Sequence, residues 1–369
     1  MITVHADVVG SLLRPPGLLK ARERLAAGTM ALPAFKAVED AAVDGAVALQ
    51  ESAGLEVVTD GEMRRLSFQS QMTEAVEGFA DHDLDAFLWG DWHGGEDAGD
   101  WSRERPAGLG ITGKLKPRRH LAAEEFTYLR ARTRRIPKVC LPSPSLWANF
   151  WDAERAGGTY ASLDAFLADV VDILKGELAE LERLGASYVQ LDAPHYTAFL
   201  DPALRSFYEQ RGWHGKQWLE RGIALDNAVM EGFPNLTFGF HLCRGNQASR
   251  WLVSGDYQPL AKPIFRRIRA QRLFLEFDDE RSGGFEPLRE VPEDKTVVLG
   301  LVTTKSARRE RPRELIARIE EAARYLPLER LALSPQCGFA TSVLGNRITP
   351  ADQKRKLRTV VRVAGEVWG

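Results

Sequence analysis

Short apolar runs alternate with longer amphipathic segments along most of the chain. The short runs are rich in β-branched and aromatic residues, a pattern typical of strands that are covered on both faces of a parallel sheet. We therefore predict eight strands, at residues 3–9, 55–60, 137–142, 187–192, 236–241, 272–277, 296–302 and 330–334.

Segments with helical periodicity separate these strands. One apolar helical face precedes the second strand and consists of Phe35, Val38, Ala42, Ala46 and Leu49. A similar face over residues 163–181 precedes the fourth strand, with Ser162 as a suitable N-cap and Gly185 as a stop. Strands that alternate with helices in this number favour an α/β fold of the closed (β/α)8 TIM-barrel type over an open sheet. The G-x-G-x-x-G motif of an open dinucleotide-binding sheet does not follow the first strand.

Two regions interrupt the alternation of strands and helices. Residues 67–135 form an insertion after the second strand, with a polar, glycine-rich centre at residues 89–95. A segment of this length inside a compact enzyme is usually a cap over the active site or a mobile loop. Residues 11–34 are expected to form an extended connection. Because no linker separates two domains, residues 1–369 are expected to form a single catalytic domain.

The composition is that of a globular protein with a large core. Hydrophobic residues make up 44% of the chain, charged residues 27%, and the formal net charge is −2. No basic stripe indicates a nucleic-acid partner, and no apolar run approaches the roughly 18 residues that span a bilayer. The N-terminus lacks the pattern of a secretory signal. We therefore expect a cytoplasmic protein without a nucleic-acid or membrane partner.

Histidine, cysteine and glutamate side chains follow several of the predicted strands. His241 and Cys243 lie on the same side of an extended segment, because strand side chains alternate. Glu276 and Cys337 follow two further strands, and the active site of such barrels lies at these carboxyl ends. Thiolates combined with an imidazole favour zinc over magnesium or calcium. Ligands from separate strands suit a catalytic zinc site rather than a structural one.

Four other polar residues follow predicted strands: Ser11, Glu62, Asp192 and Lys305. Three of the four have a second interpretation. Glu62 and Asp192 are also suited to simple structural support of the barrel rim, and Lys305 to a solvated loop. Glu276 has a competing interpretation as the partner of an arginine in a buried ion pair.

Together, these residues resemble the catalytic half of the cobalamin-independent methionine synthase family. The matching stretches are Val9-Gly10-Ser11, Asp60-Gly61-Glu62 with Arg65, Val189-Gln190-Leu191-Asp192, His241-Leu242-Cys243, Leu275-Glu276 and Cys337-Gly338. The resemblance spans nearly the whole chain. Full-length family enzymes carry an additional N-terminal half, for which 369 residues leave no room, so the chain is similar to the short, single-barrel members.

The resemblance implies zinc as the cofactor, bound by His241, Cys243, Glu276 and Cys337. It also implies that Ser11, Glu62 and Asp192 hold an amino-acid thiol such as homocysteine. A metal-coordinated thiol loses its proton and becomes a nucleophile at neutral pH. Its reaction with a methyl donor would give methionine.

Departures from the family pattern concern the methyl donor. Ala193 replaces an acidic residue, Lys305 replaces a histidine suited to proton donation, and Phe150 falls near the position of a tryptophan that lines the folate site. Lys305 is then the candidate proton donor for a methyl-folate, whose nitrogen must be protonated as the methyl group leaves. A methyl-corrinoid protein or a methylated onium compound needs no such acid, and the departures favour this kind of donor.

Two other functions compete with methionine synthesis. An alkyltransferase of the epoxyalkane–coenzyme M type resembles the same family, but coenzyme M carries a sulfonate and no amino group. Two carboxylates, Glu62 and Asp192, therefore favour an amino-acid thiol as the acceptor. The second alternative is a zinc-binding barrel without catalytic activity.

Overall fold

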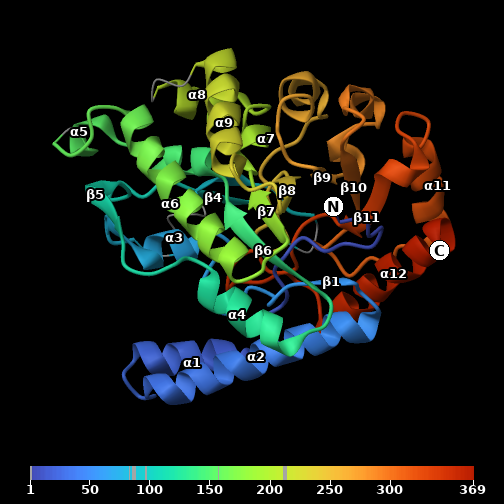
Figure 1. Cartoon of the computed structure of the whole chain (residues 1–369), viewed down its shortest axis with the longest axis horizontal. Helices are drawn as coiled ribbons and strands as arrows, with labels where there is room; N and C mark the ends of the chain where they lie inside the picture. Colours follow the sequence, from blue (N-terminus) through green and yellow to red (C-terminus); the bar gives the residue numbers. More distant parts are fainter. Residues whose placement is uncertain (1, 83, 85–88, 96–97, 157, 211–213) are drawn as a thin grey trace.

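A parallel sheet of seven strands lies at the centre of the computed structural model, which describes residues 2–82, 84, 89–95, 98–156, 158–210 and 214–369 (Figure 1). Every neighbouring pair of strands is parallel. Across the sheet the strands are, in order, β1 (Val57–Val58), β6 (Ile136–Pro142), β7 (Tyr188–Asp192), β8 (Thr237–Leu242), β9 (Arg272–Glu276), β10 (Thr296–Val302) and β11 (Leu331–Pro335).

The register of the sheet aligns the carboxyl ends of its strands. Asp192 at the end of β7 lies opposite Pro142 of β6 and His241 of β8. Glu276 at the end of β9 lies opposite Gly300 of β10. Side chains that follow different strands in the sequence are therefore brought to one edge of the sheet.

The predicted first strand, residues 3–9, does not form a strand. It makes one parallel bridge, from Ala6 to Leu333 of β11, and no strand pairing with β1 within the described residues. Side chains occupy carbonyls that a neighbouring strand would otherwise use: Lys138 donates to Val8 and Cys140 to Val9. The sheet is thus a curled half-barrel of seven strands, and the expected closed barrel of eight is confirmed only in part.

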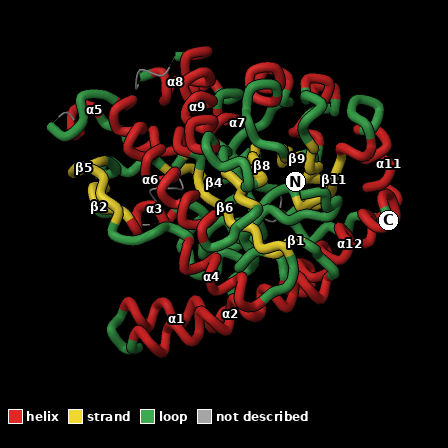
Figure 2. Tube along the Cα trace, in the orientation of Figure 1, coloured by secondary structure: helices red, strands yellow, loops and turns green. Residues whose placement is uncertain are grey.

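Helices lie around the sheet (Figure 2). The longer ones are α2 (Leu32–Ala53), α4 (Ala123–Arg132), α6 (Leu163–Arg183), α9 (Gly215–Met230), α11 (Pro312–Ala322) and α12 (Pro350–Trp368). Both predicted apolar faces belong to helices, α2 and α6. The Ser162 side chain accepts a hydrogen bond from the backbone of Ala165, and Gly185 follows α6 with a φ of 89°. Within the described ranges, none of the helices is both long and apolar enough to cross a membrane.

The expectation of an extended connection at residues 11–34 is wrong. Helix α1 (Pro16–Ala26) occupies the middle of this region and packs beside α2 (Figure 1). Pro16 stands at the first helical position, where proline fits because that residue's N–H has no partner within the helix. The proline pair therefore begins a helix instead of preventing one.

The predicted insertion, residues 67–135, consists largely of short elements outside the sheet. Strands β2 (Val76–Phe79) and β5 (Ile111–Pro117) pair antiparallel, as do β3 (Gly90–Trp92) and β4 (Trp101–Arg103). The β3–β4 hairpin is joined to the loop after β8, because the backbones of His93 and Trp251 exchange two hydrogen bonds of 2.8 Å. The hairpin therefore lies at the end of the sheet where the site residues gather.

Candidate active site

A pocket opens at the carboxyl ends of the strands and encloses about 1200 Å³ when the space at its mouth is included. The predicted site residues that line it are Ser11, Glu62, Asp192, His241, Cys243 and Cys337. Glu276 and Lys305 lie behind this lining. Six side chains from distant parts of the sequence thus meet in one cavity.

Three soft ligand atoms form a cluster in the pocket. One atom each from His241, Cys243 and Cys337 lies within 4.8 Å of the other two, and all three side chains are buried. His241 belongs to β8, Cys243 follows that strand, and Cys337 follows β11. Two sulfurs and one imidazole nitrogen form a donor set suited to zinc.

The imidazole of His241 is oriented by Asp192. Its Nδ1 lies 2.9 Å from Asp192 Oδ1, which also accepts a 2.8 Å hydrogen bond from Gln190. Its Nε2 is buried and has no partner within the part of the chain that the structure describes. Buried polar atoms are seldom left without a partner, and metal-binding histidines commonly bond a carboxylate through their other nitrogen. The unpartnered Nε2 beside two thiols therefore fits a metal ion.

The two cysteines differ in acidity. A hydrogen bond from Cys337 lowers the pKa of the Cys243 thiol to about 7, and the imidazole of His241 acts in the same direction. The same hydrogen bond, together with burial, raises the pKa of Cys337 well above its usual value. Cys243 is therefore the more acidic of the two thiols.

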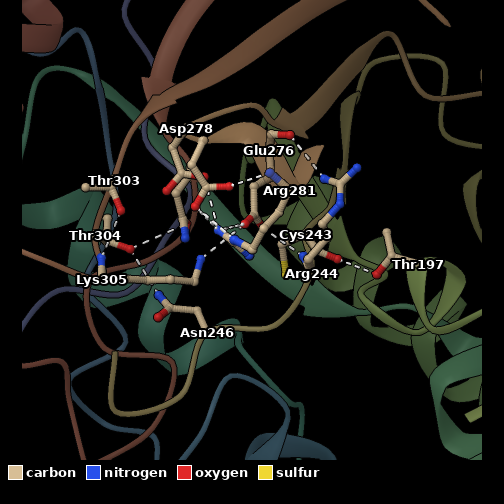
Figure 3. A network of polar contacts seen from close by, with 12 residues as sticks. Thr197, Cys243, Arg244, Asn246, Glu276, Asp278, Arg281, Thr303, Thr304 and Lys305 are labelled. Carbon is tan, nitrogen blue, oxygen red and sulfur yellow. Dashed lines mark hydrogen bonds and ion pairs between the residues drawn. The ribbon is translucent and has the colours of Figure 1, made fainter. Parts of the chain in front are cut away.

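Glu276 lies at the centre of a network of cations (Figure 3). Its Oε1 is 3.1 Å from the Arg281 guanidinium and 3.2 Å from Lys305 Nζ, and its Oε2 accepts a 2.8 Å bond from the Arg244 backbone. Burial alone would raise the pKa of Glu276, but these cations lower it to about 2. The ion-pair interpretation of Glu276 is thus realised in the structure, while its role as a fourth metal ligand stays a prediction.

Two carboxylates and a thiol make a second buried cluster, composed of Glu62, Cys140 and Asp192. Glu62 has a φ of 56°, and its Oε2 is buried without a partner. Burial raises the pKa of Glu62 to about 7. A Cβ at Gly10 would lie 2.7 Å from Glu62 Oε1, so only glycine leaves room for this carboxylate. A cationic group is the ligand that such an acidic cluster suits.

Backbone contacts fix the loops that carry Ser11 and Glu62. Ser11 Oγ accepts a 3.3 Å bond from the Ala340 backbone, and a Cβ at Gly338 would lie 2.0 Å from this oxygen. The buried Arg14 guanidinium donates to the carbonyls of Glu62 and Ala340, at 2.9 Å each. The loop after β1 and the loop after β11 are therefore held against each other at the pocket.

The insertion supplies pocket residues that the sequence analysis did not identify. Trp89 and Trp92, from its glycine-rich centre, line the pocket together with Phe68. The one available signal was the pair of tryptophans among glycines. Phe150 also lines the pocket, as the resemblance suggested, whereas the neighbouring Trp147 is fully buried outside it.

His195 is a further pocket residue that the predicted site lacks. It begins α7 (His195–Ala198), three positions beyond Asp192, and its ring lines the pocket. Its place just after a strand was a signal, but a lone histidine is more often structural. The identity of its neighbours, which come from other strands and helices, was not visible in the sequence.

Comparison with known proteins identifies the family to which the chain is similar. Residues 151–366 match the family model described as "Cobalamin-independent synthase, Catalytic domain". The chain is 34% identical to YxjH of Bacillus subtilis, an uncharacterized protein, over 99% of this chain and 94% of YxjH. It is 27% identical to the methionine synthase of Pyrococcus abyssi, over 90% of this chain and 85% of that enzyme.

A solved structure is similar over the whole chain. The Listeria monocytogenes protein assigned as a vitamin-B12-independent methionine synthase aligns with 100% of this chain and 99% of its own, with a TM-score of 0.74 and 26% identity. The family model covers more than half of the chain, and the identity to YxjH extends over nearly all of it. The chain therefore belongs to the cobalamin-independent methionine synthase family of methyltransferases.

Proposed function

We propose that this protein is a zinc-dependent methyltransferase that methylates the thiol of homocysteine and so forms methionine in the cytoplasm. One observation carries the proposal: a cluster of two thiols and an imidazole shares a pocket with two buried carboxylates. The first group suits a metal that activates a thiol, and the second suits the ammonium of an amino acid. All three cysteines are free, as thiol ligands require.

His241 Nε2, Cys243 and Cys337 would hold the zinc ion, and Glu276 would complete the set. When bound, zinc supplies the acidity that deprotonates a thiol in its coordination sphere at neutral pH. Arg281 and Lys305 keep Glu276 ionised, which is the form of a carboxylate that binds a metal. Asp192 holds the imidazole of His241 in the orientation that leaves Nε2 free.

The amino-acid part of the thiol is proposed to lie between the acidic cluster and Ser11. Glu62 and Asp192 would bind the ammonium group, and the Ser11 hydroxyl would donate to the carboxylate. Such contacts orient the sulfur toward the methyl donor, and good orientation lowers the barrier by several kcal/mol. An epoxyalkane–coenzyme M reaction stays the second candidate, but a sulfonate has no use for two carboxylates.

The architecture supports a single domain, residues 1–369, in which residues 3–9 close the barrel. Val4 and Val9 from this segment join a buried cluster with residues of β1, β7, β9, β10 and β11. Residues 67–135 would act as the cap, since Trp89 and Trp92 cover the pocket. Exclusion of water by such a cap strengthens the electrostatic interactions inside.

A methyl-folate is the methyl donor that we propose. It fits the family, whereas a methyl-corrinoid protein, which Ala193 and Lys305 favoured, finds no support in a family described as cobalamin-independent. The pocket also buries its sulfur ligands: Cys337 is 3% exposed and Cys243 5%. A small donor can enter beneath the hairpin more readily than a second protein.

Methionine formation tests this function. Zinc-loaded protein with homocysteine and 5-methyltetrahydrofolate is expected to yield methionine, detected by mass spectrometry, and Cys243→Ser is expected to yield none. Coenzyme M in place of homocysteine should be methylated at least about tenfold more slowly, because it has no ammonium group to pair with the carboxylates. Equal rates with both thiols, or methionine formation by Cys243→Ser, would count against the proposal.

Lys305 is the proposed proton donor to the folate nitrogen, and its ion pair with Glu276 sets a condition on that role. The ammonium has three N–H donors, so the folate nitrogen must be reached by one that Glu276 does not use. Lys305→Met is expected to lower turnover by roughly a hundredfold, the usual contribution of a general acid, with little change in homocysteine affinity. Lys305→Arg, which keeps the charge but not the acidity, is the control. Undiminished turnover in Lys305→Met would remove Lys305 from the mechanism.

A further inference from the structure

A buried polar cluster lies behind the pocket wall and ends in the ring of His195. Its members come from three separate parts of the fold: Ser143 and Ser145 follow β6, His195 and Tyr196 begin α7, and Asp226 belongs to α9. All five side chains are buried, and Asp226 is fully inaccessible. The proposed reaction gives this cluster no role.

Burial raises the pKa of Asp226 to about 7, so above neutral pH this group is a carboxylate and the hydrogen bonds of the cluster can be assigned proton by proton. Ser143 donates to Asp226 Oδ1 at 2.7 Å, and the Tyr196 hydroxyl donates to Asp226 Oδ2 at 2.5 Å. Each of these hydroxyls has a single proton to give. The remaining hydroxyl, Ser145 Oγ, lies 2.7 Å from His195 Nε2 but 3.5 Å from Asp226 Oδ2.

These distances select one tautomer of the histidine. If Nε2 carried the proton and donated to Ser145, the serine proton would be left with acceptors at 3.1 Å (Ser143 Oγ), 3.3 Å and 3.5 Å, all longer than the usual range of about 2.5–3.0 Å for O–H···O bonds. If Ser145 donates to Nε2, every hydroxyl in the cluster makes a bond of 2.7 Å or less. The ring proton of neutral His195 is then on Nδ1. Burial lowers the pKa of His195 to about 3, which keeps the ring neutral.

Among the residues that the structure describes, Nδ1 of His195 has no partner. The atom is buried, and the ring is 4% exposed where it lines the pocket. A buried N–H without an acceptor costs about 1–3 kcal/mol, so native structures rarely keep one unless a ligand or water uses it. Leu146, Phe150, Ala198 and Leu204 line the same pocket with apolar side chains, which offer no acceptor.

We propose that His195 contacts the methyl donor and donates a hydrogen bond from Nδ1 to a carbonyl oxygen or ring nitrogen of a flat, neutral ring. The apolar wall would stack on the faces of that ring, and His195 would recognise its edge. Ser145 and Asp226 are positioning residues, because they act only by fixing the tautomer and orientation of His195. The identity of the ligand as methyl donor rests on the proposed function, whereas the tautomer does not.

Nitrogen-15 NMR of histidine-labelled protein tests the tautomer. Nδ1 of His195 is expected to carry the proton in the wild type. In Ser145→Ala the bond to Nε2 is lost, and the ring should shift toward the Nε2–H form. Ser206→Ala, which removes an exposed hydroxyl on α8 (Pro202–Glu209), should leave the spectrum of His195 unchanged. An Nε2–H tautomer in the wild type, or no response to Ser145→Ala, would overturn the assignment.

Equilibrium binding of 5-methyltetrahydrofolate tests the contact. His195→Leu is expected to weaken this binding at least tenfold, the order expected for one buried hydrogen bond, while homocysteine affinity changes less than about twofold. In His195→Asn the amide nitrogen stands near the position of Nδ1, so most of the affinity should return. Equal affinity in wild type and His195→Leu, or an equal loss for homocysteine, would overturn the proposal. Because no turnover is measured, both experiments stay informative even if methionine is not the product.

Discussion

Cys337→Ser is expected to lose stoichiometric zinc. The wild type should hold about one zinc ion per chain, since two thiols and the free Nε2 of His241 meet in one buried cluster. A serine hydroxyl is a far weaker zinc ligand than a thiolate, so the affinity should fall on the order of a thousandfold. Elemental analysis of demetallated and reconstituted protein, with a competing chelator, measures both quantities.

Cys140→Ser is the matched control for this loss. Cys140 is also buried, but its sulfur donates to the Val9 carbonyl and lies in the acidic cluster instead of the metal cluster. The Cys140→Ser variant should retain zinc at the wild-type level. Wild-type zinc affinity in Cys337→Ser, or the same loss in Cys140→Ser, would contradict the assignment of the ligands.

Glu62→Gln is expected to weaken homocysteine binding by about 1–3 kcal/mol, which is roughly 5-fold to 150-fold. Glu62 Oε2 is buried without a partner, and an ammonium group would supply one. Glutamine keeps the shape of the side chain but removes the charge. Binding of coenzyme M, which has no ammonium group, should be unaffected or stronger. Calorimetric titration of both thiols into the zinc-loaded protein gives the comparison.

The effect of Glu62 should also depend on pH. Burial raises the pKa of this carboxyl to about 7, so part of it is protonated at neutral pH. An ammonium ligand prefers the carboxylate and lowers that pKa, so binding releases a proton and homocysteine affinity rises between about pH 6 and pH 8. Deprotonation of the thiol contributes to this rise equally for coenzyme M. The difference in pH dependence between homocysteine and coenzyme M therefore reports on the Glu62 carboxyl group. Glu62→Gln should abolish this difference.

Asp192→Asn provides a contrast to Glu62→Gln. Asp192 belongs to the acidic cluster and also contacts His241. Its loss should therefore weaken the binding of both homocysteine and zinc, and the zinc affinity should fall by about 10-fold to 100-fold. Glu62→Gln should leave zinc affinity at the wild-type level. Unchanged homocysteine affinity in both variants would mean that the carboxylates support the rim only.

Strands were the most predictable part of this fold. Runs such as Val297–Val302 are apolar at nearly every position because helices cover one side of the sheet and the barrel interior the other. Residues 3–9 have the same pattern, yet the side chains of Lys138 and Cys140 take up the carbonyls of Val8 and Val9. The helix that begins at Pro16 was not predicted, because proline is favoured at the start of a helix as well as in an extended chain.

The candidate site was predictable where strand ends alone decide position. His241, Cys243 and Cys337 meet because parallel strands bring their carboxyl ends together. The cation network around Glu276 was not predictable, since Arg281 reaches it from a loop whose path depends on tertiary packing. Trp92 was not predictable either, because it lies on a hairpin that is distant in the sequence from the strand ends but reaches the pocket in the fold.

Zinc K-edge X-ray absorption tests the central claim most directly, because it counts the sulfur atoms bound to the metal. Without substrate, two sulfurs are expected, from Cys243 and Cys337. Addition of homocysteine should raise the count to three, whereas serine, which has the same charged groups and no thiol, should not change it. A sulfur count that stays at two in the presence of saturating homocysteine would contradict activation of this thiol by the metal.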